Sequence, residues 1–330
     1  MIGQKQGQEE IDLLEIIRPG VQSSIQDLGR PGYGRFGIPP AGAMDPWSLQ
    51  VTNALLGNPA GAAAVEMTLA GVKARCLAPS VVALGGGEGE YFLNGQRVAP
   101  WQSLALSPGD MLDVGGISRG CRVYLGVHGG IEVPVVLGSR STYLPASLGG
   151  KEGRALRRGD ILRGHPCEEK HISRRLLPSL RPVLADKAEL RVLRGLHAAF
   201  FPAEEWERFL ASDYTVTPRS NRMGCRLAGE AVKARSAGNL ISDALVTGAI
   251  QVPPDGEPII LGVDRQTTGG YPVIAALVTA DLAKVGQLPP GQIVRFRAIS
   301  LAEAQELKEK QAKFLRSLSL WGKETFICGR

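Results

Sequence analysis

The chain has 330 residues and a formal net charge of +6, and at roughly 150 residues per domain this length predicts two domains, each able to bury its own core. No apolar stretch reaches the roughly 18 residues of a membrane-spanning helix, and the polar start MIGQKQGQEE lacks the apolar core of a secretory signal. Basic residues gather at 151–181 and at 308–316 without interleaved aromatic side chains, which argues against nucleic-acid binding and predicts solvated surface.

In the first half of the chain, the first predicted helix follows Asp45, which can cap its start, and ends at Gly57. β-branched runs bounded by Gly or Pro then predict strands at 80–86 and 122–127. The glycines of 85–89 (GGGEG) lack the Gly-Lys-Ser/Thr sequence of a phosphate loop. A flexible turn at the end of a strand is therefore favoured there over a nucleotide site.

The second half of the chain continues the same pattern, with strands predicted at 190–193, 245–252, 258–263 and 292–296. The run from Val252 to Pro258 predicts a hairpin connection between two of them. One helix is predicted near Pro202, with Glu204 and Glu205 in its first turn, and another begins with a capping box from Ser300 to Glu303. Many short strands separated by turns are typical of a barrel or a sandwich.

The five cysteines are odd in number and widely spaced, and no two form a CxxC pair. This spacing predicts reduced thiols, and hence a cytoplasmic protein, rather than a disulfide framework or a structural zinc site.

Three loops carry side chains suited to binding a small polar molecule: 26–32 (QDLGRPG), 43–45 (AMD) and 266–272 (QTTGGYP). They combine an acid, amides and a guanidinium with glycines and prolines that fix the backbone without covering it. The alternative interpretation is a set of ordinary turns, in which Asp27 caps backbone amides and Arg30 pairs with a neighbouring acid.

A further turn, Ser220-Asn221-Arg222, presents a hydroxyl, an amide and a guanidinium, a combination that suits a carboxylate or a phosphorylated intermediate. The alternative is an Asx-type turn in which Arg222 pairs with Glu66 or Asp243. Glu66 is an acid among apolar neighbours, so it is either paired structurally or suited to proton transfer.

These motifs, in this order, resemble the KipA-like family, also called the allophanate hydrolase subunit 2 family. The family includes the C subunit of the ATP-dependent 5-oxoprolinase complex and part of the carboxytransferase region of urea carboxylase. The resemblance runs from about Leu13 to Phe296, through 126–142, 217–227 and 242–272. His128 is a departure, because a small residue is expected there, so we assign it no catalytic role.

The resemblance implies a mainly β fold with two cyclophilin-like β-barrel domains and a few short helices. Loops at 26–45 would then approach those at 219–224 and 266–272. We expect a disordered tail at 1–11, a first barrel at 12–170, a linker at 171–187, a second barrel at 188–300, and a C-terminal helix and tail at 301–330.

The resemblance further implies ATP-dependent opening of the lactam of 5-oxoproline, shared with a KipI-like B subunit and a LamB/YcsF-like A subunit. ATP with Mg would be the cosubstrate, bound jointly with the partner because the chain has no nucleotide motif of its own. The residues implied as catalytic are Asp27, Glu66 and Arg222. Those implied as substrate-binding are Gln26, Arg30, Asp45, Ser220, Asn221, Gln266, Thr268 and Tyr271.

Two alternatives stay open at this point. One is carboxyl transfer from carboxybiotin to urea or a related amide; because no lysine lies in a Met-Lys context, no biotin would be attached to this chain. The other is a non-catalytic KipA-like regulator that binds a KipI-like kinase inhibitor.

Overall fold

The computed structural model describes residues 10–166, 173–235 and 240–319. The chain divides into two compact units, of which the first comprises Met1–Gly29, Pro46–Pro182 and Leu315–Arg330, and the second comprises Arg30–Asp45 and Val183–Phe314. The predicted binding loop at 26–32 is therefore shared between the units. Most of the predicted tail, at 1–9, and residues 171 and 172 of the predicted linker lie outside the described residues.

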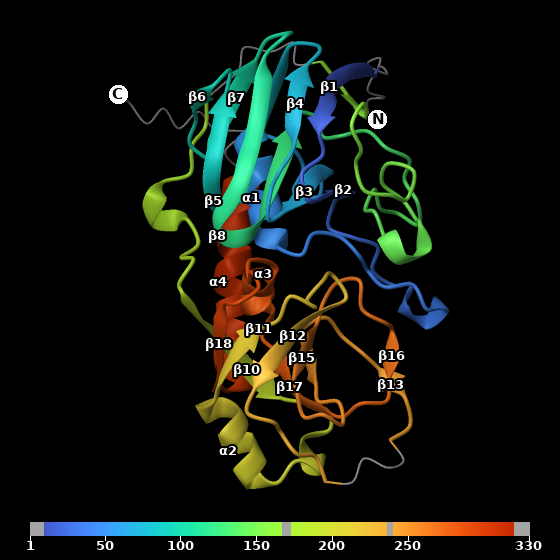
Figure 1. The fold of residues 1–330 in the computed structure, drawn as a ribbon, viewed down its shortest axis with the longest axis vertical. Coiled ribbons are helices and arrows are strands. Elements are labelled where there is room, and N and C mark those ends of the chain that lie inside the picture. The colour runs from blue at the N-terminus through green and yellow to red at the C-terminus, as the bar shows by residue number, and fades with distance from the viewer. Residues whose placement is uncertain (1–9, 167–172, 236–239, 320–330) are drawn as a thin grey trace, which may run out of the picture. The chain divides into compact units, whose positions relative to one another are not determined.

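The first unit is built on a sheet that has nine strands within the described residues, in the order β2-β3-β8-β4-β1-β9; β5 also pairs with β8, and β6 and β7 pair with β5 (Figure 1). Every strand pair in this sheet is antiparallel. The strands are β1 Ile11–Arg18, β2 Gln22–Gln26, β3 Ala64–Thr68, β4 Lys73–Cys76, β5 Ser80–Leu93, β6 Gln96–Arg97, β7 Ser103–Leu106, β8 Met111–Val127 and β9 Ile161–Gly164. Helix α1 covers Pro46–Leu56, and 3-10 turns lie at Leu144–Ala146 and Pro178–Leu180.

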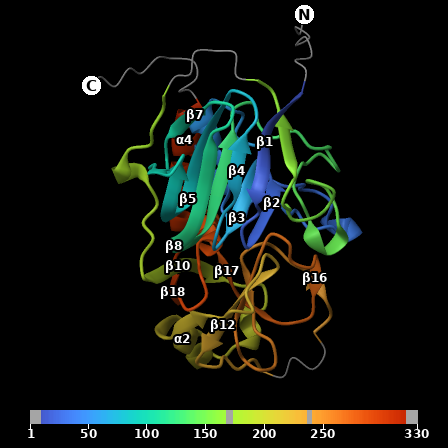
Figure 2. The same cartoon turned by 45° about the horizontal axis from the view of Figure 1, so that its top comes forward.

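The long strands β5 and β8 lie side by side along most of their length, as Figure 2 shows. Their register shifts between Gly86 and Glu88 and again between Glu88 and Gly89. A Cβ at Gly86 would fall 2.3 Å from the carbonyl oxygen of Arg122, so glycine allows the two backbones to approach. The predicted strand-end turn at 85–89 is therefore wrong: these glycines form an irregular part of the interior of a long strand.

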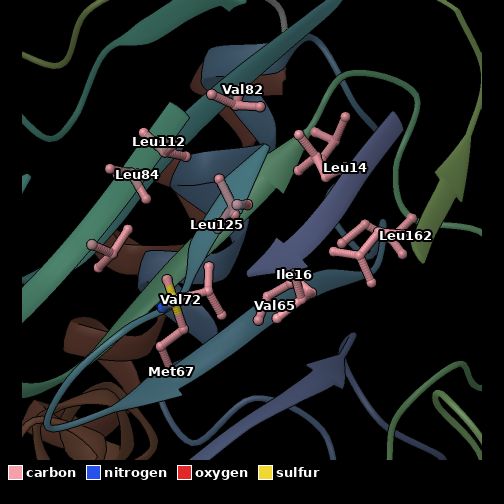
Figure 3. Close-up of a cluster of buried hydrophobic side chains, with 14 of the residues drawn as sticks. Leu14, Ile16, Val65, Met67, Val72, Val82, Leu84, Leu112, Leu125 and Leu162 are labelled. Atoms are coloured by element: carbon pink, nitrogen blue, oxygen red, sulfur yellow. The ribbon is translucent and has the colours of Figure 1, made fainter. Parts of the chain in front are cut away.

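One face of the sheet forms the core of the first unit, because alternate residues of each strand point to the same side. Figure 3 shows Leu14, Val65, Leu84 and Leu125 gathered in this core. On the opposite face, α1 packs closely against β5: a Cβ at Gly85 would fall 2.3 Å from the Oγ1 atom of Thr52 in α1. Helix α1 begins at Pro46 and ends before Gly57, as the sequence predicts.

The strands of the second unit close into a seven-stranded barrel, counted over the described residues, in the order β10-β17-β14-β15-β12-β11-β18. The parallel pairing of β10 with β18 closes it. Its strands are β10 Lys187–Arg194, β11 Asp213–Val216, β12 Gly224–Gly229, β14 Ala249–Gln251, β15 Ile259–Leu261, β17 Val273–Leu277 and β18 Ile293–Ala298, and β13 Asp243–Ala244 pairs with β16 Thr268–Gly269 outside the barrel. The helices are α2 Ala203–Ala211, α3 Leu282–Gly286 and α4 Leu301–Ser319, of which residues 301–314 belong to this unit, with 3-10 turns at Gly34–Phe36, Ala198–Phe200 and Thr279–Asp281.

The predicted hairpin between two strands of this barrel is confirmed, because β14 and β15 pair antiparallel on either side of the 252–258 connection. The strand predicted at 245–252 is shorter than expected and covers only β14. The residues before it form a turn, in which the Ala249 N–H donates to the Val246 carbonyl.

An aromatic cluster fills one part of the barrel core, where the rings of Phe209 and Phe296 stack with centroids 4.5 Å apart and Tyr214 packs against both. Trp206 and Phe209 of α2 are buried. The mainly β class is confirmed, with a half-barrel sheet in the first unit and a closed barrel in the second. Across the described ranges, the helices do not combine the length and apolarity that a membrane crossing requires.

Candidate functional site

Asp27 follows β2 directly and is 8% exposed. Its Oδ1 accepts hydrogen bonds from the Gly29 N–H at 2.7 Å, from the Ser139 hydroxyl at 2.6 Å and from the Ser141 hydroxyl. Its Oδ2 accepts the Arg140 N–H at 2.6 Å. These four donors satisfy the carboxylate and tie the end of β2 to residues 139–141. The geometry suits a residue that positions this loop.

Gln26 is fully buried beside Asp27. Its Nε2 donates to the Ser24 hydroxyl at 2.9 Å and to the Thr142 carbonyl at 3.1 Å. Its Oε1 has no hydrogen-bond partner among the residues the structure describes. A buried acceptor without a donor is costly, and the N–H of a bound amide would satisfy it.

Glu66 lies on β3, where the strand register places it between Ser24 of β2 and Tyr124 of β8. The Tyr124 hydroxyl donates to its Oε2 at 2.7 Å, and the Arg122 Nε lies 3.5 Å from its Oε1. All three of these side chains are nearly fully buried. Of the two alternatives drawn from the sequence, the structure shows the paired one.

Arg222 lies in the second unit and is 5% exposed. Its Nε and Nη2 donate to the two carboxylate oxygens of Asp264 at 2.8 and 3.0 Å, and Nη2 also donates to the Gly42 carbonyl at 2.7 Å. The sequence-based alternative of a structural ion pair is therefore observed, with Asp264 as a partner that the sequence did not suggest. This guanidinium joins β12, the end of β15 and the 30–45 segment.

The segment Arg30–Asp45 forms further hydrogen bonds with residues of the second unit. The Ala41 N–H donates to the Val263 carbonyl at 3.1 Å, and the Gln287 Nε2 donates to Asp45 at 2.7 Å. A Cβ at Gly286 would fall 2.6 Å from the Met44 carbonyl oxygen, so this contact needs glycine. For residues 30–45, the expected approach to the 219–224 loop is confirmed.

Arg30 and Asp45 are both buried and both belong to the second unit. The backbone N–H of Arg30 donates to the Pro40 carbonyl at 2.7 Å, which closes residues 30–40 into a loop. Their predicted contact with substrate stays a prediction.

Ser220 and Asn221 build the turn that the sequence offered as an alternative. The Asn221 Oδ1 accepts the Met223 N–H at 2.8 Å, which is an Asx-type turn, and the Ser220 hydroxyl accepts the Arg226 N–H at 3.0 Å. This turn presents Arg222 to Asp264. The side chain of Asn221 remains exposed.

The 266–272 loop is the most accessible of the predicted binding loops, because Gln266, Thr268 and Tyr271 are all exposed. Its inner side rests on Gln251, a buried residue whose Nε2 donates to the Tyr271 carbonyl at 3.2 Å. Gln266 approaches the same residue, with its Nε2 3.5 Å from the Gln251 Oε1.

Sequence reasoning missed Asp264 and Arg265, which stand immediately before this loop and are both buried. The signal for them was an acid followed by a base directly after the apolar strand 258–263, at the end of a strand where functional loops begin. Metal-binding clusters of three or more His, Cys, Asp or Glu residues do not occur in the described part of the chain.

Several known proteins are similar to this chain. It is 36% identical to the C subunit of 5-oxoprolinase from Escherichia coli strain K12 over 307 residues, which cover 93% of this chain and 98% of that protein. It is 37% identical to urea amidolyase of Saccharomyces cerevisiae over 330 residues, covering 94% of this chain but only 18% of that protein.

The fold is similar to that of a solved structure as well. The crystal structure of the Kluyveromyces lactis urea carboxylase superimposes with a TM-score of 0.87 at 34% identity, covering 95% of this chain and 30% of that one. Residues 36–298 match the carboxyltransferase domain, subdomain A and B. With most of its length matched and both β units present, the chain belongs to the carboxyltransferase domain family, subdomains A and B.

Proposed function

We propose that this chain is the C subunit of an ATP-dependent 5-oxoprolinase and helps to open the lactam of 5-oxoproline to glutamate. The observation that carries the proposal is the match to the C subunit of the Escherichia coli 5-oxoprolinase over 98% of that protein's length. The urea amidolyase of Saccharomyces cerevisiae is matched over only 18% of its length. The match therefore spans almost the whole length of the 5-oxoprolinase subunit but only a small part of the urea amidolyase.

The contacts around the predicted catalytic residues support positioning roles for them. Asp27 holds residues 139–141, and Arg222 with Asp264 holds the 30–45 segment. A rigid frame of this kind fixes binding groups within the narrow limits that catalysis requires. In the first unit, the buried Oε1 of Gln26 suits the N–H of an amide. In the second, exposed Gln266 and Thr268 can orient a polar substrate.

ATP with Mg remains part of the proposal as a cosubstrate, but the glycine run of this chain does not fit its phosphates. Gly86 and Gly89 lie within β5, where added Cβ atoms would fall 2.3 Å from the Arg122 carbonyl oxygen and 2.5 Å from that of Gly116. These glycines serve strand packing. We therefore assign no phosphate-binding step to this run, and place phosphate binding with the KipI-like partner and the remaining hydrolysis with the LamB/YcsF-like partner.

Reconstitution tests this assignment. The purified chain alone should neither hydrolyse ATP nor open 5-oxoproline, whereas the mixture of all three subunits should show ATP hydrolysis that depends on 5-oxoproline. Glutamate formation is measured in the same samples, and each pair of subunits serves as a control. An active two-component mixture that lacks this chain would contradict the proposal.

Carboxyl transfer is the second candidate, favoured by the TM-score of 0.87 to the urea carboxylase of Kluyveromyces lactis. In that case the chain would carboxylate urea in the presence of a carboxybiotin-carrying protein, and 5-oxoproline would not be consumed. Measuring both substrates with the same preparation separates the two functions. A regulator that only binds a KipI-like protein would show neither activity.

A further inference from the structure

Arg265 is a buried cation in the second unit, 8% exposed, at the start of the loop that holds Gln266, Thr268 and Tyr271. Its Nε and Nη2 donate to the Leu245 carbonyl at 3.3 and 2.9 Å, and its Nη1 donates to the Thr247 hydroxyl at 2.9 Å. All of these acceptors are neutral. Within the described ranges, Arg265 forms no ion pair with a carboxylate.

This arrangement leaves a desolvated positive charge that is paired with no carboxylate of the described residues. Burial lowers the pKa of Arg265, but an arginine starts so far above neutrality that its guanidinium stays charged. A buried charge is costly unless an opposite charge accompanies it. The neighbouring Arg222 differs in this respect, because Asp264 receives its guanidinium on both carboxylate oxygens.

The guanidinium of Arg265 also retains donors. Of the five N–H groups of an arginine, the three hydrogen bonds use one on each nitrogen, so one N–H remains on Nη1 and one on Nη2. Two such N–H groups on the terminal nitrogens can receive the two oxygens of a planar carboxylate.

Amide groups suited to a polar ligand lie near Gly269, in the loop that follows Arg265. A Cβ at Gly269 would fall 2.8 Å from the Leu245 Cδ1, 3.0 Å from the Gln251 Nε2 and 3.5 Å from the Gln266 Nε2. Gly269 therefore lets the loop lie directly on Gln251 and on Leu245, whose carbonyl holds Arg265. Leu245 and Gly269 thus link the guanidinium of Arg265 to the amides of Gln251 and Gln266 within the second unit.

We propose that Arg265 binds the carboxylate of the substrate through the remaining N–H groups of its terminal nitrogens. The proposal rests on the proposed function, because 5-oxoproline carries a carboxylate beside its lactam whereas urea carries none. It moves the role of carboxylate recognition from Arg222, whose guanidinium is already paired, to the residue that precedes Gln266.

The test compares ligands that differ only in the carboxylate. Binding of 5-oxoproline and of 2-pyrrolidinone to the reconstituted complex is measured by calorimetry without ATP. The wild-type complex should prefer 5-oxoproline about tenfold to a hundredfold, the range of one charge-assisted hydrogen-bonded contact. R265Q should remove this preference while leaving the affinity for 2-pyrrolidinone nearly unchanged, and R265K should retain part of it.

Two controls keep the outcomes separate. Arg219→Gln removes an exposed guanidinium, whose side chain is 67% exposed, and should leave the preference unchanged. If circular dichroism shows that R265Q does not fold, the test uses R265K instead. This variant keeps the charge but loses the planar pair of donors. An intermediate preference for 5-oxoproline over 2-pyrrolidinone would then support the proposal. An unchanged preference in R265Q, or in R265K where R265Q is lost, would overturn it.

A second ligand pair makes the result independent of lactam opening. N-carbamoylglycine and N-ethylurea are ureido compounds with and without a carboxylate. If the complex fails to consume 5-oxoproline, the proposed function fails, but a preference for N-carbamoylglycine that R265Q abolishes still supports carboxylate binding by Arg265. Absence of any carboxylate preference in the wild-type complex, for both pairs, refutes the inference.

Discussion

Replacing Arg222 by methionine tests whether this residue clamps the 30–45 segment or binds substrate. The substitution keeps an unbranched apolar stem but removes both bonds to Asp264 and the bond to the Gly42 carbonyl. Asp264 is 1% exposed, so its carboxylate would stay buried without this partner. A buried charge that loses its partner typically destabilises a protein by about 3–5 kcal/mol.

A loss of this size corresponds to about two to four orders of magnitude in a local opening equilibrium, because each 1.4 kcal/mol is tenfold. Amide hydrogen exchange followed by mass spectrometry measures such openings for each peptide separately. This method suits a chain of two units better than a single global unfolding curve does. In R222M, peptides from 30–45 and 259–264 should exchange faster by these factors. Peptides from β8 in the first unit should not change.

The double variant R222M/D264L provides the matched control, because it removes the carboxylate of Asp264 together with the guanidinium that binds it. Replacing both members of a buried ion pair with apolar side chains is often close to neutral, so protection should largely return. The reasoning is refuted if R222M leaves exchange in 30–45 unchanged, or if the double variant exchanges as fast as the single one. Lost activity with unchanged exchange would restore a direct role for Arg222 in binding.

Two further predictions concern carboxylates with several donors. Asp27→Asn replaces the carboxylate that accepts the Arg140 N–H and two serine hydroxyls by an amide. We therefore expect a loss of stability of about 1–3 kcal/mol and faster amide hydrogen exchange at 139–142. A hundredfold drop in activity with unchanged exchange would instead indicate a catalytic role. Burial alone would raise the pKa of Asp281, but hydrogen bonds from Arg191 and Lys284 outweigh it and hold that pKa below its ordinary value. This stabilisation is complete above the unfolded pKa of about 3.9 and is lost as the pH falls through the lower folded pKa. Between pH 5 and pH 2, the midpoint of urea unfolding should therefore fall less steeply with pH in Asp281→Asn than in the wild type. Equal slopes in the two proteins would contradict this assignment.

The sequence by itself determined the features that depend on neighbouring residues. Helix α4 begins at Leu301 because the Ser300 hydroxyl accepts the Glu303 N–H at 3.2 Å, half of the predicted capping box. Helix α1 ends before Gly57, whose φ of +71° suits glycine. Strand signals and turn residues likewise predicted the mainly β class and the hairpin between β14 and β15, since each depends on a few adjacent side chains.

Only the tertiary structure decided which polar groups meet. Asp27 and Ser139 are 112 residues apart, and Arg222 and Asp264 are 42 apart, so no local pattern could join them. The same holds for the 30–45 segment, which leaves the first unit and packs on the second. The partners that each guanidinium meets when it is buried decide its role. A guanidinium that binds a buried carboxylate is fixed in place. One that is buried among neutral acceptors still attracts an anion. That difference separates Arg222 from Arg265, and it depends on folding rather than on residue type.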